Sequence, residues 1–138
     1  MSADFFIDTQ RGVVFSRAEG VCGRADILDH MDRLRHHPDF RRELEQLFDF
    51  RKVTKATLSE EDVKILAAWN VFSGQSKRAL VVSSDAHYGL ARMFEAYREF
   101  AGEHGIVIFR EMAEALSWLA LSTEPDPNLF TKLVPAAG

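Results

Sequence analysis

The chain has 138 residues, of which 46% are hydrophobic and 28% charged, which is typical of an ordinary globular domain and excludes a disordered or fibrous chain. A formal net charge of -4 gives no overall basic surface for nucleic acid, and a single cysteine excludes an internal disulfide or a thiolate metal cluster. The N-terminal residues lack the features of a secretory signal, and no apolar stretch reaches the ~18 residues that cross a bilayer, so we expect a cytoplasmic protein.

The first part of the chain predicts a hairpin, a helix and a third strand. Short β-type runs at 4–8 and 13–19 are separated by a turn of the length that suits an antiparallel hairpin. Apolar residues then recur at helical spacing through 27–34, and the helix ends before Pro38. A third strand is predicted at 45–50.

Helices and strands alternate in the rest of the chain. Ser59, with Asp62 three residues further on, has the spacing of a capping box and predicts the start of a second helix. A continuous apolar run at 79–83 is typical of a central strand that is covered on both faces. After the third helix, a last strand is predicted at 106–109 and a last helix at 111–120.

This order of elements predicts an α/β fold. Its sheet should be mixed and mostly parallel, with about five strands, an antiparallel edge strand and about four helices packed on it. We expect a single domain over residues 1–122. The proline-containing segment 123–138 is predicted to be an extended tail.

Three phrases carry a resemblance to a known family. They are HPDF at 37–40, RALVVSSDAHYGLARMFEAY at 78–97 and IVIFREMAEALSWL at 106–119. Together with the order of elements, they resemble the SpoIIAA-like family, whose fold is related to STAS domains and to lipid-transfer CRAL-TRIO domains. The resemblance runs from the first hairpin to Leu121. It implies a bacterial protein with a SpoIIAA-like (STAS-like) fold, in a family of mostly unknown function for which ligand or membrane association has been proposed.

The signalling branch of this fold carries a phosphorylatable serine in an Asp-Ser-Ser-Gly turn after the third strand. This sequence has TLSEED at 57–62 in that place. Ser59 has a structural role there as a helix cap, and its acidic neighbours would repel an added phosphate. The sequence therefore predicts no phosphorylation switch.

The segment 81–94, VVSSDAHYGLARMF, concentrates polar residues beside an apolar strand. Ser84, Asp85 and His87 are the residue types of a hydrolase triad, but a triad converges from separate segments and these lie within one turn. We expect Asp85 to cap the helix that follows, and we expect a non-enzymatic protein. An unknown activity at Asp85, His87 and Tyr88 stays the alternative.

A histidine- and aspartate-rich stretch at 29–39 contains residue types that bind metals. His30 and His37 are seven residues apart, however, and the stretch lacks the pairing that puts two imidazoles on one face of a helix. We therefore expect a solvated helix end there, with no metal site and no cofactor.

Ligand binding is the leading hypothesis, because in open α/β sheets ligands gather at the carboxyl ends of the strands and 83–88 is such an end. The second helix adds a hint, since Ile65, Trp69 and Phe72 form an apolar stripe opposite the one that faces the sheet. Either this stripe is exposed, or a neighbouring helix or the apolar tail residues Leu129, Phe130, Leu133 and Val134 cover it.

We therefore expect a binding module for a lipid, another amphipathic ligand or a membrane surface, acting through a groove between the second and third helices. A protein-interaction or regulatory module of the anti-anti-sigma-factor type, or a homodimer, is the alternative. Arg92 is the expected partner of an anion. The expected ligand-binding residues are Ile65, Trp69, Phe72, Ser84, His87, Tyr88, Arg92 and Met93.

Overall fold

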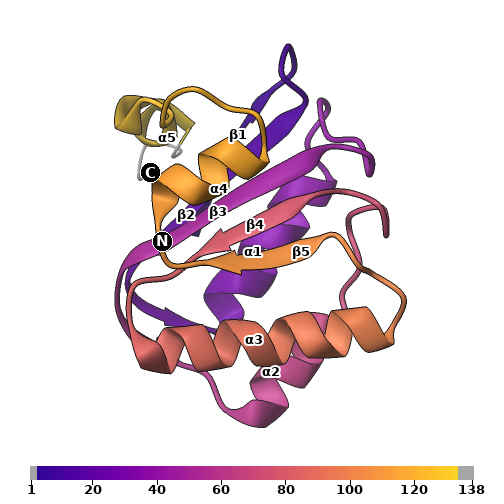
Figure 1. Ribbon diagram of the computed structural model, residues 1–138, viewed down its shortest axis with the longest axis vertical. Coiled ribbons are helices and arrows are strands. Elements are labelled where there is room, and N and C mark those ends of the chain that lie inside the picture. Colours follow the sequence, from indigo (N-terminus) through magenta and orange to yellow (C-terminus); the bar gives the residue numbers. More distant parts are fainter. Residues whose placement is uncertain (1–2, 134–138) are drawn as a thin grey trace.

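Five strands form one sheet, and they lie side by side in the order in which they follow along the chain (Figure 1). The computed structural model describes residues 3–133. The strands are β1 (Ala3–Asp8), β2 (Val13–Gly23), β3 (Glu45–Thr57), β4 (Arg78–Val81) and β5 (Ile106–Phe109). β1 pairs antiparallel with β2, and all other neighbours are parallel. This confirms the mixed, mostly parallel sheet with an antiparallel edge strand.

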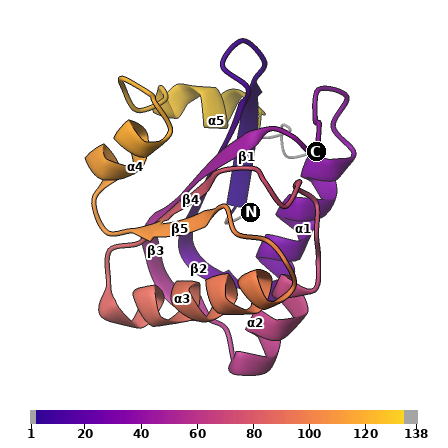
Figure 2. The same ribbon diagram turned by 45° about the vertical axis from the view of Figure 1, so that its right-hand side comes forward.

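Helices cover both faces of the sheet (Figure 2). α1 (Arg24–Arg35), α2 (Glu60–Ala67) and α3 (Asp85–Phe100) each connect two parallel neighbours, and right-handed crossovers that step in one direction put all three on one face. α4 (Met112–Trp118) and α5 (Pro127–Leu133) lie on the other face. Residues 3–133 thus form five helices where the sequence predicts about four. Within this part of the chain, no helix is long and apolar enough to cross a membrane.

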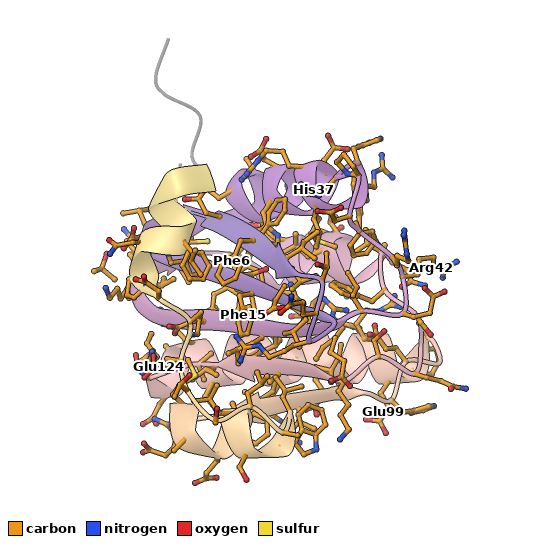
Figure 3. The ribbon with its side chains drawn as sticks, turned by 90° about the horizontal axis from the view of Figure 1, so that it is seen from above. Phe6, Phe15, His37, Arg42, Glu99 and Glu124 are labelled. Carbon is orange, nitrogen blue, oxygen red and sulfur yellow. The ribbon has the colours of Figure 1, made fainter. Side chains whose placement is uncertain are left out.

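Side chains that alternate along the strands give the sheet two apolar faces. Phe6, Phe15 and Leu47 belong to the core beneath α4 and α5, and Phe6 lies beside α5 in Figure 3. Phe5 and Phe48 point to the opposite face, where they join the core beneath α1, α2 and α3. The candidate site lies on this second face.

β3 continues well beyond the predicted strand, to Thr57 instead of residue 50. The added stretch is polar, so the apolar pattern does not mark it as a strand. Its backbone pairs along its whole length with β2, from Val13 opposite Glu45 to Gly23 opposite Thr57. The backbone pairing of two long strands, rather than burial of side chains, therefore sets this length.

The start of α2 is confirmed. The hydroxyl of Ser59 accepts the backbone N–H of Asp62 at 3.1 Å, and the carboxylate of Asp62 accepts the backbone N–H of Ser59 at 2.9 Å. The helix is short, however, and ends at Ala67. Trp69 and Phe72 therefore do not continue its face.

The exposed stripe that the sequence suggests on the second helix is wrong for Phe72, whose side chain is 0% exposed. Beyond the end of the helix the chain turns, and Phe72 enters the core with Leu34 of α1 and meets the Phe40 ring edge-on at 5.4 Å. Trp69 is half-buried, and the guanidinium of Arg35 lies 5.1 Å from its ring. α1 and its following loop cover this region.

The predicted extended tail is wrong for Pro127–Leu133, which forms α5. Phe130 on this helix is buried, with its ring 5.1 Å from that of Phe6 and the Arg17 guanidinium 4.5 Å away. α5 thus covers the face of the sheet opposite to Trp69 and Phe72. The side chain of Leu133, and Val134 as a whole, lie outside the described structure.

If α5 is docked by Phe130, then Phe130→Ala should lower the free energy of unfolding by about 3 kcal/mol, because it leaves a cavity against Phe6. Leu129→Ala is the matched control, since Leu129 is 36% exposed on the same helix and should cost much less. Urea denaturation of both variants measures the difference. Equal stabilities would contradict the docking.

Candidate functional site

An apolar cavity of about 100 Å³ lies between the sheet and the layer of α1, α2 and α3. Its walls follow the regular spacings of the elements that build it. Every second residue lines it from 46 to 50 on β3 and from 78 to 82 along and just beyond β4, and positions i, i+3, i+4 and i+7 line it on α3. These wall residues are Gln46, Phe48 and Phe50, then Arg78, Leu80 and Val82, then His87, Leu90, Ala91 and Phe94.

The burial of the wall changes along the strands. At the amino end, Gln46, Arg78 and Phe72 are buried almost completely. At the carboxyl end, Phe50 and His87 are only half-buried. The carboxyl edge of the sheet is therefore the more accessible end of the cavity.

A chain of buried polar side chains crosses the closed end. Ser16 on β2 lies 2.8 Å from Nε2 of His30 and accepts a hydrogen bond from Nε2 of Gln46 at 3.1 Å. Nε of Arg78 donates to Oε1 of Gln46, also at 3.1 Å. The guanidinium of Arg78 continues the chain to Glu103, donating from Nη1 to both carboxylate oxygens at 3.2 and 3.1 Å.

Glu103 is shared by two arginines. Nε of Arg98 donates to its Oε1 at 2.8 Å, and Nη1 of Arg98 donates to the carbonyl of Ala67 at 2.7 Å. All three charged side chains are buried. Burial lowers the pKa of Arg78, and the nearby negative charge of Glu103 partly offsets this effect. A guanidinium nevertheless keeps its proton in proteins. The group therefore carries two positive charges and one negative charge.

His30 is buried and neutral. Burial, together with the smaller effect of the charges of Arg33 and Arg78, lowers the pKa of His30 to about 3. Its ring lies 4.7 Å from the Phe48 ring, and its Nδ1 has no hydrogen-bond partner among the described residues. The prediction of a solvated helix end is therefore wrong for His30, which packs from α1 against β2 and β3 of the sheet. Within residues 3–133, no group of three or more His, Cys, Asp or Glu could hold a metal ion.

The structure brings two of the eight expected ligand-binding residues, Phe72 and His87, to the wall of the cavity. Ile65, Trp69 and Met93 are half-buried outside its lining. Arg92, the expected anion partner, is exposed and pairs with Glu95 of the same helix at 3.2 Å. Ser84 and Tyr88 also lie outside the lining.

The predicted cap of α3 is wrong by one residue. Ser84 is the N-cap, and its hydroxyl accepts the backbone N–H of His87 at 3.1 Å. Asp85 is the first residue of the helix, and its carboxylate is 94% exposed and pairs with Arg110 at 2.7 Å. The Arg110 guanidinium also lies 5.4 Å from the ring of Tyr88. The carboxylate of Asp85 therefore forms an ion pair with Arg110 and does not orient the side chain of His87.

Sequence reasoning missed the buried polar chain. Arg78 directly precedes an apolar run, and a charged residue in that position usually lies at the exposed start of a strand. Arg98 and Glu103 follow the pattern of a charged helix end. Arg78 bonds Gln46 and Arg98 bonds Ala67, and each pair is more than thirty residues apart in the chain. No local sequence pattern therefore reveals these contacts.

Ser84→Ala should lower the free energy of unfolding by about 1 kcal/mol, because it removes a capping hydrogen bond. Asp85→Ala should cost less, since it removes an exposed ion pair. Thermal or urea denaturation at neutral pH compares the two. A larger loss of unfolding free energy in Asp85→Ala than in Ser84→Ala would indicate that Asp85, not Ser84, caps the helix.

His30 should make the protein less stable as the pH falls below about 6.5. The unfolded chain takes up a proton at His30 near pH 6.5, whereas the folded chain does so only near pH 3. Between pH 7.5 and pH 5 this difference should cost roughly 2 kcal/mol of unfolding free energy. His30→Phe removes the titrating group and should reduce the loss by that amount. The measurement is urea denaturation of both proteins at the two pH values, and equal losses in both would contradict a buried neutral His30.

The comparisons with known proteins bear on the fold. No family model matches the chain, and no curated protein matches it. The chain is similar to the crystal structure of an uncharacterized protein of the DUF3478 family from Shewanella loihica PV-4, which has a SpoIIAA-like fold. The TM-score is 0.56 at 15% sequence identity, over 86% of this chain and 94% of that one. The fold of this protein is therefore SpoIIAA-like, as the resemblance of its sequence implies.

Proposed function

We propose that the protein is a non-enzymatic binding module that takes the apolar part of an amphipathic molecule into the cavity between the sheet and α1, α2 and α3. The observation that carries the proposal is the cavity itself, with a volume of about 100 Å³ and mostly apolar walls. An unfilled cavity of this size costs about 2 kcal/mol in lost contacts. An apolar occupant regains those contacts.

The proposed site lies deeper than the groove that the sequence suggests. It is formed by the inner sides of the three helices and by the sheet, so Phe72 and His87 take part while Trp69 does not. Its more accessible end lies at the carboxyl edge of the sheet, where ligands usually gather in open α/β folds. A SpoIIAA-like fold is compatible with a binding or regulatory module.

Binding is favoured over catalysis by the arrangement of the polar residues. The carboxylate of Asp85 is engaged with Arg110, and the backbone N–H of His87 with the Ser84 hydroxyl. A hydrolytic site needs a nucleophile, a base and an orienting group in contact with one another. The alternative of a protein-interaction surface on Trp69 and Phe72 loses its main support, because Phe72 is buried.

Filling the cavity should abolish binding. Ala91→Leu places three further heavy atoms in the cavity from α3, whereas Ala96→Leu makes the same change on the exposed side of that helix. We expect at least one of octanoate, octan-1-ol and octylamine to bind the parent protein in isothermal titration calorimetry. Ala91→Leu should weaken that binding by at least about tenfold, and Ala96→Leu should not change it.

Two results would overturn the proposed function. One is that none of the three compounds binds the parent protein. The other is that Ala91→Leu binds them as tightly as Ala96→Leu does, while both variants keep the circular dichroism spectrum of the parent. The second result would place any binding outside the cavity.

A further inference from the structure

We propose that the ligand of this cavity is a monoanionic acid with an alkyl chain, whose carboxylate pairs with Arg78 at the closed end while the chain extends toward the carboxyl edge of the sheet. The inference rests on the proposed function and names the class of molecule that the site selects.

The first support is an unbalanced buried charge. Arg78 and Arg98 share the single carboxylate of Glu103, and within residues 3–133 no other carboxylate pairs with either arginine. A buried charge is costly unless an opposite charge compensates it. One monoanion at this place would balance the group, whereas a neutral head would not.

The second support is the position of the donor. Arg78 is 4% exposed and yet lies on the cavity wall, which Arg98 does not. The three hydrogen bonds of Arg78 use Nε and Nη1, and Nη2 donates to none of the residues 3–133. The Nη2 group of Arg78 is therefore available to donate a hydrogen bond to a ligand in the cavity. A carboxylate is the acceptor that suits the planar guanidinium group.

The third support is the order of the residues along the wall. Gln46 and Arg78 are register partners on β3 and β4, and the next inward pair is Phe48 opposite Leu80. Val82 continues the apolar wall one step further. The cavity therefore has a charged end and an apolar path of about 13 Å from Arg78 to Val82. An acid with a medium alkyl chain has the same order of groups.

His87 is an alternative binding residue for the polar head of the ligand. Its Nδ1 is buried without a hydrogen-bond partner among the described residues, and the residue lines the cavity at the accessible end. A single ring nitrogen could orient a neutral head, but it does not compensate the charge around Arg78. The experiment therefore includes His87→Phe.

The test compares octanoate, octan-1-ol and octylamine by isothermal titration calorimetry at pH 7.5 and low salt. The parent protein should bind octanoate at least about tenfold more tightly than octan-1-ol, and octylamine most weakly. Arg78→Met should abolish the preference for octanoate. This variant leaves Glu103 paired with Arg98, so no buried carboxylate loses its last partner.

Arg92→Met is the matched control, since it removes an exposed arginine of α3 outside the cavity, and it should keep the preference. Arg78→Lys, which keeps the charge, should keep the preference for octanoate over octan-1-ol with weaker binding. If Arg78→Met does not fold, this lysine variant and the ligand series on the parent protein still decide the matter.

Each contrary outcome is distinct. A parent protein that binds octan-1-ol or octylamine as tightly as octanoate overturns the acid specificity and leaves the proposed function intact, whereas a protein that binds none of the three compounds overturns both. Loss of the preference in Arg92→Met or His87→Phe, with the preference retained in Arg78→Met, would move the anion to another residue and also overturn the proposal.

Discussion

The buried guanidinium of Arg78 is the constraint on which the helical side of the fold depends. It bonds Gln46 on β3 and Glu103 in the segment before β5, and its carbon lies 4.5 Å from the centre of the Phe72 ring. Through Glu103 it reaches Arg98 on α3, which bonds the carbonyl of Ala67 at the end of α2. One charged group thus fixes two strands, two helices and a loop relative to one another. Because each buried polar atom needs its partner, these elements cannot shift independently.

This network explains where the cavity ends. Side chains that are held by several hydrogen bonds cannot rotate to fill nearby space. The row formed by Gln46 and Arg78 is therefore a rigid closed end of the cavity. Beyond that row the walls are mostly aliphatic and aromatic side chains, with His87 as a polar residue at the accessible end. The result is a face of the sheet that is itself amphipathic along the strand direction, charged at one end and apolar at the other.

The sequence predicts those parts of the fold that depend on local chemistry. The capping box at Ser59, the hairpin and the parallel crossovers are confirmed because each follows from residues close together in the chain. Apart from the cap of α3, which is wrong by one residue, the errors arise where tertiary contacts overrule a local pattern. A helical stripe through Phe72 fails because α2 stops at Ala67, and an extended tail fails because Phe130 finds an apolar surface on Phe6. The candidate site is mostly of this second kind, so only Phe72 and His87 could be anticipated.

The polar row also separates this site from an ordinary packing defect. A defect in an apolar core is lined by apolar atoms on every side, and it stays dry because nothing in it attracts water or an ion. Here the closed end of the cavity carries a guanidinium whose charge is only partly offset by Glu103. Such a group attracts an anion more strongly in a buried site than on the surface, because little water is present to screen it. The same side chain that holds the helices in place is therefore the one to which we assign the proposed preference of the cavity for an anion.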